Sequence, residues 1–162
     1  MYTLRCTQRL LRRMPLAITT RPIATTTKLG DWYANVLFLR KQQLILCTSE
    51  RSLLSVVVPA KNLDMLPVRL RNAVQSLFRV LGLPARSAAG EIREMSHLIV
   101  GKTVSRSVLG TMNDIIQHCR WHTANRPSLD LRALELELAE MPAQPLEFGL
   151  PREQAAALLG AA

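Results

Sequence analysis

Residues 34–58 read ANVLFLRKQQLILCTSERSLLSVVV, and this stretch decides the fold. It holds three short runs rich in Leu, Val and Ile, at residues 34–39, 44–47 and 53–58. The polar breaks between them suit hairpin loops. We therefore predict an antiparallel meander of three strands. Because the runs are nearly continuous rather than alternating, we expect helices to cover much of both sheet faces.

The segment after the meander predicts an amphipathic helix over residues 63–81. Its leucines recur at helical spacing, Asp64 is placed to cap it, and Pro67 is tolerated in the first turn. Gly82 and Pro84 end it. Farther along, the pattern predicts a helix over 87–95, a strand over 98–102, a helix over 105–122 and a helix over 129–141. The alternation of Leu134, Leu136 and Leu138 also permits a strand in the last of these.

The first residues complete the set of elements. Residues 2–6 predict a strand, and Thr7 can cap a helix that runs through Met14, before a loop over residues 15–30 that is rich in Thr and Pro. The order of elements predicts an α+β fold, a single domain over residues 1–141 with a four- to five-stranded, mostly antiparallel sheet packed by about four to five helices. We expect residues 142–162 to form an acidic, Ala-rich and partly flexible tail, frayed from residue 155.

Size and cysteine usage agree with one domain. A chain of 162 residues buries enough surface for a core. Because aromatic content is low (4%), we expect aliphatic side chains to build that core. Cys6, Cys47 and Cys119 are far apart and form no Cys-x-x-Cys pair, so we expect reduced, buried thiols in a cytoplasmic protein. Nothing in the composition calls for a cofactor.

The net charge of +9 is unevenly distributed. Residues 1–126 hold 19 Lys and Arg against 6 Asp and Glu, a balance of +13, whereas residues 127–162 hold 2 against 6, a balance of −4. A basic body attracts polyanions such as nucleic acid, or an acidic protein surface. Two alternatives stay open: the arginines only solvate helix faces, or the acidic tail lies over the basic face as an intramolecular competitor.

The first 28 residues contain six basic residues and no acidic one, a composition that resembles an organellar transit peptide. The strand and helix signals in the same segment favour the beginning of the domain instead. We find no apolar run of about 20 residues, and therefore expect a soluble, cytoplasmic protein without membrane contact.

The helix predicted over residues 105–122 is the best candidate for a binding site. One side is an apolar stripe, and the other gathers polar residues beside the end of the preceding strand. An arginine in a first helical turn can bind phosphate or carboxylate together with backbone N–H groups. The candidate residues are Lys102, Thr103, Arg106, Ser107, Gly110, Asn113 and Asp114.

A structural explanation of the same residues stays open. Gly110 can let the helix pack tightly against another, Asn113 and Asp114 can bond a neighbouring loop, and Arg106 can pair with Asp114. A second candidate, Trp32 with Tyr33 and Asn35 near Arg40 and Arg51, has the composition of a base-stacking platform. The alternative is that Trp32 anchors the core through its ring and one N–H bond.

The histidines give weak support for a metal-binding or catalytic site. His118 and His122 are spaced as two metal ligands on one helix, but no carboxylate lies between them and no third ligand follows nearby. We therefore expect surface histidines and no metal site. Hydrolase triads and Gly-rich phosphate loops have no support in the sequence.

Three stretches carry a resemblance to a known family: Arg5-Cys6-Thr7 followed by Leu10-Leu11, Gly30 to Asn35 (GDWYAN), and Arg106 to Asp114 (RSVLGTMND). Together they resemble a family of small bacterial proteins classified only as a domain of unknown function. The similarity spans roughly residues 1–141 in matching order. It implies a single bacterial domain and assigns no catalytic or binding residue.

Three hypotheses of function follow. The first is a module that binds nucleic acid or another polyanion, in a regulatory or mobile-element context. The second is a protein-interaction or assembly module without catalysis, for which a homodimer is one form. The third is a metal-independent enzyme of the ribonuclease type that uses Arg and His groups, and we favour the two binding hypotheses over it.

Overall fold

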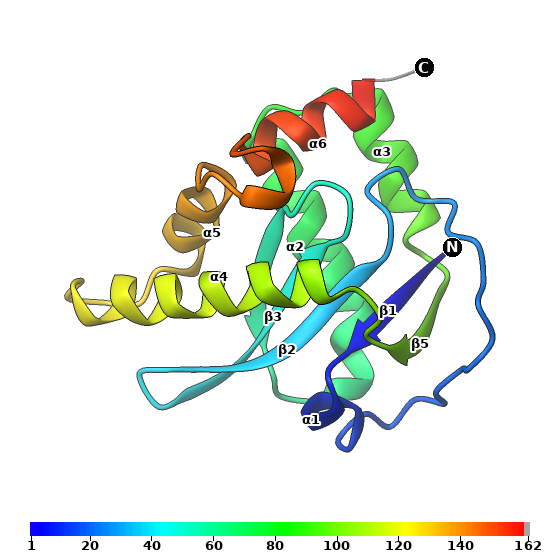
Figure 1. The fold of residues 1–162 in the computed structure, drawn as a ribbon, viewed down its shortest axis with the longest axis horizontal. Helices are drawn as coiled ribbons and strands as arrows, with labels where there is room; N and C mark the ends of the chain where they lie inside the picture. Colours follow the sequence, from blue (N-terminus) through cyan, green and yellow to red (C-terminus); the bar gives the residue numbers. More distant parts are fainter. Residues whose placement is uncertain (161–162) are drawn as a thin grey trace.

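The computed structural model describes residues 1–160, in which five strands form one mixed sheet in the order β4-β3-β2-β1-β5 (Figure 1). The strands are β1 (Tyr2–Cys6), β2 (Trp32–Leu39), β3 (Gln42–Ser49), β4 (Ser55–Pro59) and β5 (Leu98–Lys102). The predicted meander is confirmed, since β2, β3 and β4 pair antiparallel. Arg40 and Lys41 close its first hairpin with positive φ angles of 47° and 63°, as the twist of a two-residue hairpin turn requires.

The other two ladders are parallel. β1 lies inside the sheet, parallel to both β2 and β5. Parallel pairing needs long connections, and the chain supplies them: residues 7–31 lead from β1 to β2, and two helices lead from β4 to β5. Most paired residues are antiparallel, so the predicted α+β fold with a mostly antiparallel sheet is confirmed. β1 is thereby an integral strand of the domain.

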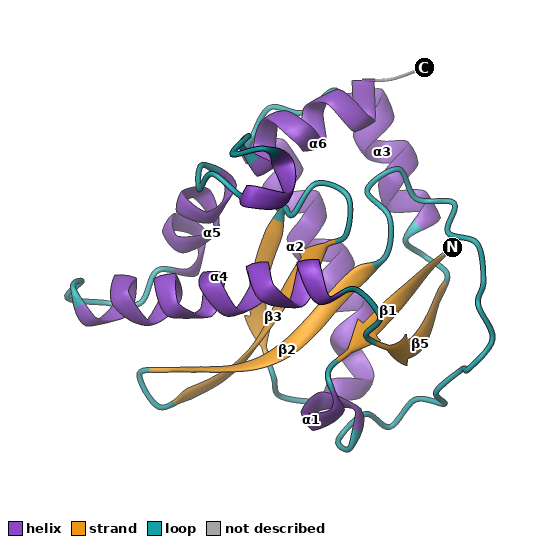
Figure 2. Cartoon of the chain, in the orientation of Figure 1, coloured by secondary structure: helices purple, strands orange, loops and turns teal. Residues whose placement is uncertain are grey.

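Within residues 1–160, six α-helices surround the sheet (Figure 2). They are α1 (Gln8–Leu11), α2 (Leu66–Val80), α3 (Ala85–Glu94), α4 (Arg106–Ala124), α5 (Leu131–Ala139) and α6 (Pro151–Gly160), with short 3₁₀ turns η1 (Leu63–Met65) and η2 (Gln144–Leu146). The helix predicted over 129–141 is confirmed as α5, and its strand alternative is wrong. Asp130 explains the choice, because its carboxylate accepts the Ala133 N–H at 3.0 Å and begins the helix.

Two predicted caps are wrong. Asp64 lies inside the 3₁₀ turn, and Met65 occupies the N-cap position of α2 without a side-chain bond. Thr7 occupies the N-cap of α1, but its hydroxyl donates to Asn35 instead of bonding the helix. This short helix ends at Leu11 rather than Met14.

The two sheet faces are covered by different helices, which gives two hydrophobic clusters. Side chains of α2, α3 and α6 pack on the face that carries Tyr2, Leu4 and Trp32. α4 packs across β2 and β3 on the opposite face, and α5 packs there against β4 (Figure 1). Covered faces explain why the strands read as nearly continuous apolar runs.

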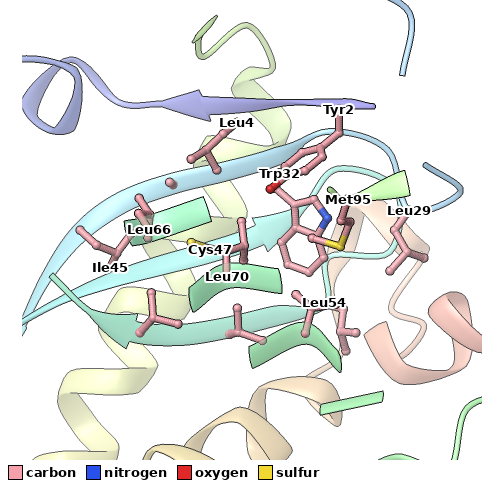
Figure 3. Packing of buried hydrophobic residues seen from close by; sticks show 14 of the residues in the cluster. Tyr2, Leu4, Leu29, Trp32, Ile45, Cys47, Leu54, Leu66, Leu70 and Met95 are labelled. Atoms are coloured by element: carbon pink, nitrogen blue, oxygen red, sulfur yellow. The ribbon is translucent and has the colours of Figure 1, made fainter. Parts of the chain in front are cut away.

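Trp32 anchors the first cluster. Its ring is fully buried and lies beside Tyr2, Leu29 and Met95 (Figure 3). Of the two predicted roles of Trp32, the structure shows the core anchor. The buried ring offers no surface for stacking a base. Its Nε1–H has no hydrogen-bond partner among residues 1–160, contrary to our expectation of one bond.

The C-terminal segment is helical where we expect fraying. Residues 151–160 form α6, and Ala155 and Leu159 are buried in the first cluster beside α3. Burial of these side chains explains the order of residues 155–160, so that expectation is corrected for them. Residues 161–162 lie outside the described part, and a domain boundary at residue 141 stays a prediction.

Candidate functional site

The polar side of α4 is exposed, as the candidate site requires. Arg106, Gly110, Asn113 and Asp114 face solvent, whereas the apolar stripe of the helix is buried against β2 and β3. The helix begins here because Oγ of Ser105 accepts the Val108 N–H at 3.2 Å.

Arg40, another candidate, lies at the far end of the same helix. Its guanidinium donates to the carbonyls of Thr123 at 2.9 Å and Pro127 at 3.0 Å, and also to that of Arg126. A helix of 19 residues is about 28 Å long. Arg40 therefore fastens the hairpin to the C-terminal end of α4 and does not join Arg106.

Asn35 is also occupied within the fold. Its Oδ1 accepts the Val36 N–H at 2.8 Å and the Thr7 hydroxyl at 2.9 Å. Because Trp32 is buried and Asn35 is hydrogen-bonded within the fold, neither residue of the predicted stacking platform is available to a ligand.

Lys102 lies in a cavity of about 460 Å³, which we call the basic cleft. The cleft is lined by residues of β1, β5 and the connection between α1 and β2. That connection passes outside β5 (Figure 1). Its lining residues are Thr3, Arg5, Thr19, Thr20, Arg21, Pro22, Gly101, Lys102 and Val104. None of these described lining residues is acidic, and three carry a positive charge.

Arg5 is the best-ordered cation of the cleft. Its Nε donates to Oδ2 of Asp31 at 2.8 Å, and its Nη1 donates to the Lys102 carbonyl at 3.2 Å. The side chains of Arg5 and Asp31 are only 18% and 6% exposed. The other oxygen of Asp31 accepts the Thr3 N–H at 2.9 Å. Since these bonds use two of the five guanidinium donors, the group is held in place with donors to spare.

Gly101 keeps the cleft open. A Cβ at this position would lie 2.9 Å from Cγ2 of Thr3 and 3.8 Å from Nη1 of Arg5. The outer wall is fixed by the Thr19 N–H, which donates to the Val100 carbonyl at 2.8 Å. A larger residue at 101 would therefore displace the side chains that line the cleft.

A second cavity, which we call the α4 groove, has a volume of about 340 Å³ and receives most of the other candidates. One wall is the exposed side of α4 and the other is the segment 141–145. The α4 residues that line it are Arg106, Ser107, Gly110, Thr111 and Asp114. The predicted site is therefore split in two, with Lys102 in the basic cleft and Arg106 in the α4 groove. Thr103 and Asn113 line neither cavity.

The structural explanation of Gly110 and Arg106 fails. A Cβ on Gly110 would find no atom within 4 Å outside its own helix, so no neighbour needs the glycine for close packing. No ion pair joins Arg106 to Asp114 within residues 1–160.

The histidines of α4 are bound to a carboxylate that the sequence pattern did not reveal. Glu137 of α5 lies 3.2 Å from Nε2 of His118 and 2.8 Å from Nδ1 of His122, and Arg126 donates to its other oxygen at 2.7 Å. His122 is buried, which corrects our expectation of surface histidines. Burial acts to raise the pKa of Glu137, but the bonds from the histidines hold that pKa below its usual range. The part of the chain that the structure describes contains no cluster suited to a metal ion.

The sequence reasoning missed Thr3, Arg5, Asp31 and Gly101. A signal was present, because Arg5 and Asp31 belong to two of the stretches that carry the family resemblance. The residue just before the third stretch bonds the second, since the N–H of Ser105, the N-cap of α4, donates to the Tyr33 hydroxyl at 3.2 Å. Burial, followed by the charge of Glu50, raises the pKa of Tyr33, which keeps this hydroxyl neutral.

Comparison with known proteins adds a family and no activity. No helix in residues 1–160 is long and apolar enough to cross a membrane. Neither curated proteins nor solved structures give a match. A family model matches residues 3–154, so the similarity extends beyond residue 141 and includes part of α6. The chain therefore belongs to the family described as "Domain of unknown function (DUF6933)".

Proposed function

We propose that the protein binds the phosphate backbone of nucleic acid in the basic cleft. One observation carries the proposal: three basic residues and three threonines line a single cavity whose described lining contains no acidic residue. Guanidinium, ammonium and hydroxyl groups are the side-chain donors that most often contact phosphate oxygens.

Each cation has a distinct part in this interaction. Arg5 is held by Asp31, so it loses little conformational freedom when it binds, and its planar donors match phosphate geometry. Arg21 and Lys102 are more exposed and provide attraction at longer range. The hydroxyls of Thr19 and Thr20, which are not buried, can donate to the remaining phosphate oxygens.

A polyanion is favoured over a small anion because positive charge continues past the cleft. α1 begins two residues after β1, near the end of the strand that carries Arg5 (Figure 1). Arg9 in α1 and Arg12 and Arg13 directly after it are exposed. The acidic C-terminal segment does not compete for the cleft. Its Glu135, Glu137 and Glu140 pair with arginines or histidines near them, and none of the described residues that line the cavity is acidic.

The cleft supports binding better than it supports the ribonuclease hypothesis. Its lining residues offer no imidazole or carboxylate for proton transfer, and Asp31 is engaged in holding Arg5. General acid–base catalysis needs such a group within hydrogen-bond reach of the substrate.

The test is binding of a fluorescein-labelled single-stranded RNA and a DNA of the same sequence across a salt series. For the parent protein we expect the logarithm of affinity to fall linearly with the logarithm of salt concentration. Arg21→Ala and Lys102→Ala should each weaken binding and reduce the slope by about 0.7 per lost phosphate contact on a single strand.

Arg86→Ala is the matched control, because Arg86 is exposed on α3, which packs on the other face of the sheet. It removes the same charge and should leave the slope unchanged. Affinity that does not depend on salt, or equal losses in all three variants, would rule out the cleft as the binding site.

A further inference from the structure

Gly110 is an unexplained feature of α4. It lies inside a helix of 19 residues, where glycine is unfavourable compared with alanine. Its φ angle is not positive, and no neighbouring atom lies within 4 Å of where a Cβ would be. Neither backbone conformation nor packing therefore requires a glycine. The remaining explanation for the glycine is that it leaves space in the α4 groove, which a side chain would fill.

The groove that Gly110 lines is already formed. Its opposite wall is held by a compact turn in which the Ala143 N–H donates to the Gly149 carbonyl at 3.2 Å and the Phe148 N–H donates to the Ala143 carbonyl at 3.0 Å. Ala143 is buried in the second cluster, which attaches this turn to the core. A ligand would therefore not have to order the wall in order to bind.

The charges in the groove select a ligand unlike that of the basic cleft. Arg106 and Asp114 both line it, separated by eight residues of helix, or about 12 Å along the axis. The carboxylate of Asp114 repels a polyanion that would continue past Arg106. A ligand that satisfies both ends carries one negative and one positive group about 12 Å apart.

We propose that the α4 groove binds an extended peptide segment of a partner protein, with an acidic side chain at Arg106 and a basic side chain at Asp114. An extended chain advances about 3.3 Å per residue, so the two side chains are separated by about three residues. Gly110 lies between the two charges and lets the peptide backbone approach the helix closely. Met141 and two prolines on the other wall provide apolar contact for the residues between them.

The experiment offers the immobilised full chain a peptide library in which one Glu and one Lys flank a randomised spacer of graded length. We expect the parent protein to enrich peptides with spacers of about three residues. Gly110→Leu, which fills the groove, should weaken binding of an enriched peptide at least about tenfold. Asn113→Leu is the matched control, because it adds the same side chain to the same exposed side of α4 outside the groove, and it should bind like the parent.

Charge reversal gives a second readout. Arg106→Glu should abolish binding, and the double variant Arg106→Glu with Asp114→Lys should bind the peptide in which Glu and Lys are exchanged. Enrichment without a preferred spacer, equal binding by Gly110→Leu, or equal enrichment of peptides that contain only Glu would overturn the proposal. Thermal unfolding checks that each variant is folded. The proposal does not depend on nucleic-acid binding, which Arg21→Ala and Lys102→Ala test at the other cavity.

Discussion

Single residues in this protein act mainly through the neighbours that hold them. Arg5 is the example, since Asp31 positions it and also bonds the backbone of Thr3. The sequence could not reveal this group, because Thr3 and Arg5 meet Gly101 only when β1 and β5 pair in parallel. By contrast, helical periodicity alone predicted that α4 has an apolar and a polar side. It did not predict that the polar side, with Arg106, Asn113 and Asp114, is exposed.

The Asp31→Ala variant tests the importance of that carboxylate. It leaves a poorly exposed guanidinium and a buried backbone N–H without their acceptor, so we expect a loss of about 3 kcal/mol in the free energy of unfolding. Urea denaturation measures it. Glu140→Ala is the comparison, because its pair with Arg152 is about half exposed on both sides, at 49% and 48%, and an exposed pair contributes less than about 1 kcal/mol. Equal losses would show that Asp31 has no special role.

Gly110→Ala should have the opposite effect. Because a Cβ at this position meets open space, the substitution gains helix propensity without a clash. We expect the free energy of unfolding to rise by about 1 kcal/mol, as measured by thermal or urea unfolding. Gly90→Ala in α3 is a second helical glycine for comparison, with the Arg93 guanidinium 3.9 Å from the new methyl group. A loss of stability in Gly110→Ala would mean that the glycine serves the fold.

At the scale of elements, a side chain of α5 supplies a hydrogen-bond acceptor to the backbone of strand β4. Oε1 of Glu135 in α5 accepts the Val57 N–H of the edge strand β4 at 3.1 Å. Nη1 of Arg132 lies 3.0 Å from Oε2 of Glu135, although neither N–H of this nitrogen points at an acceptor among the described residues. The elements themselves were largely predictable from periodicity, because α2, α4 and the meander have strong apolar patterns. Pairs such as Glu135 with Val57 join distant parts of the sequence and leave no local pattern.

Glu135 should make stability depend on pH. Burial raises its pKa to about 7, against the opposing effects of the Val57 N–H and Arg132. The folded protein then binds a proton that the unfolded chain releases at lower pH, so the stability contribution is complete below the unfolded pKa of about 4.5 and is lost as pH rises through about 7. Glu135→Gln keeps an acceptor for the Val57 N–H. We expect it to reduce the dependence of the free energy of unfolding on pH between these two pH values. An unchanged slope would contradict the assignment.

At the scale of the whole molecule, the fold decides the chemistry of the cysteines. Cys6 and Cys47 flank Ala34 on neighbouring strands. Two strand spacings put their Cα atoms about 9.6 Å apart, beyond the reach of a disulfide. The sequence correctly predicted free, buried thiols from the spacing of the residues along the chain. The interior position of β1 was not predictable, because parallel partners from distant segments have no signature in composition or spacing.

The three thiols should be unreactive until the protein unfolds. Burial raises the pKa of Cys6 and of Cys119 to about 12 and that of Cys47 farther still, so almost no thiolate forms at neutral pH. We expect negligible labelling by a thiol-reactive chromophore in buffer and complete labelling of all three in urea. Rapid labelling of the native protein would show that one cluster opens readily.

The interior position of β1 also sets the order in which the molecule can be assembled. Residues 2–6 leave the ribosome well before β5, the neighbouring strand that ends only at Lys102. Until that distant strand arrives, the nascent chain carries an apolar strand with an unsatisfied backbone edge, the kind of surface that attracts incorrect partners. Completion of the sheet and formation of the basic cleft therefore coincide, since both depend on the arrival of β5.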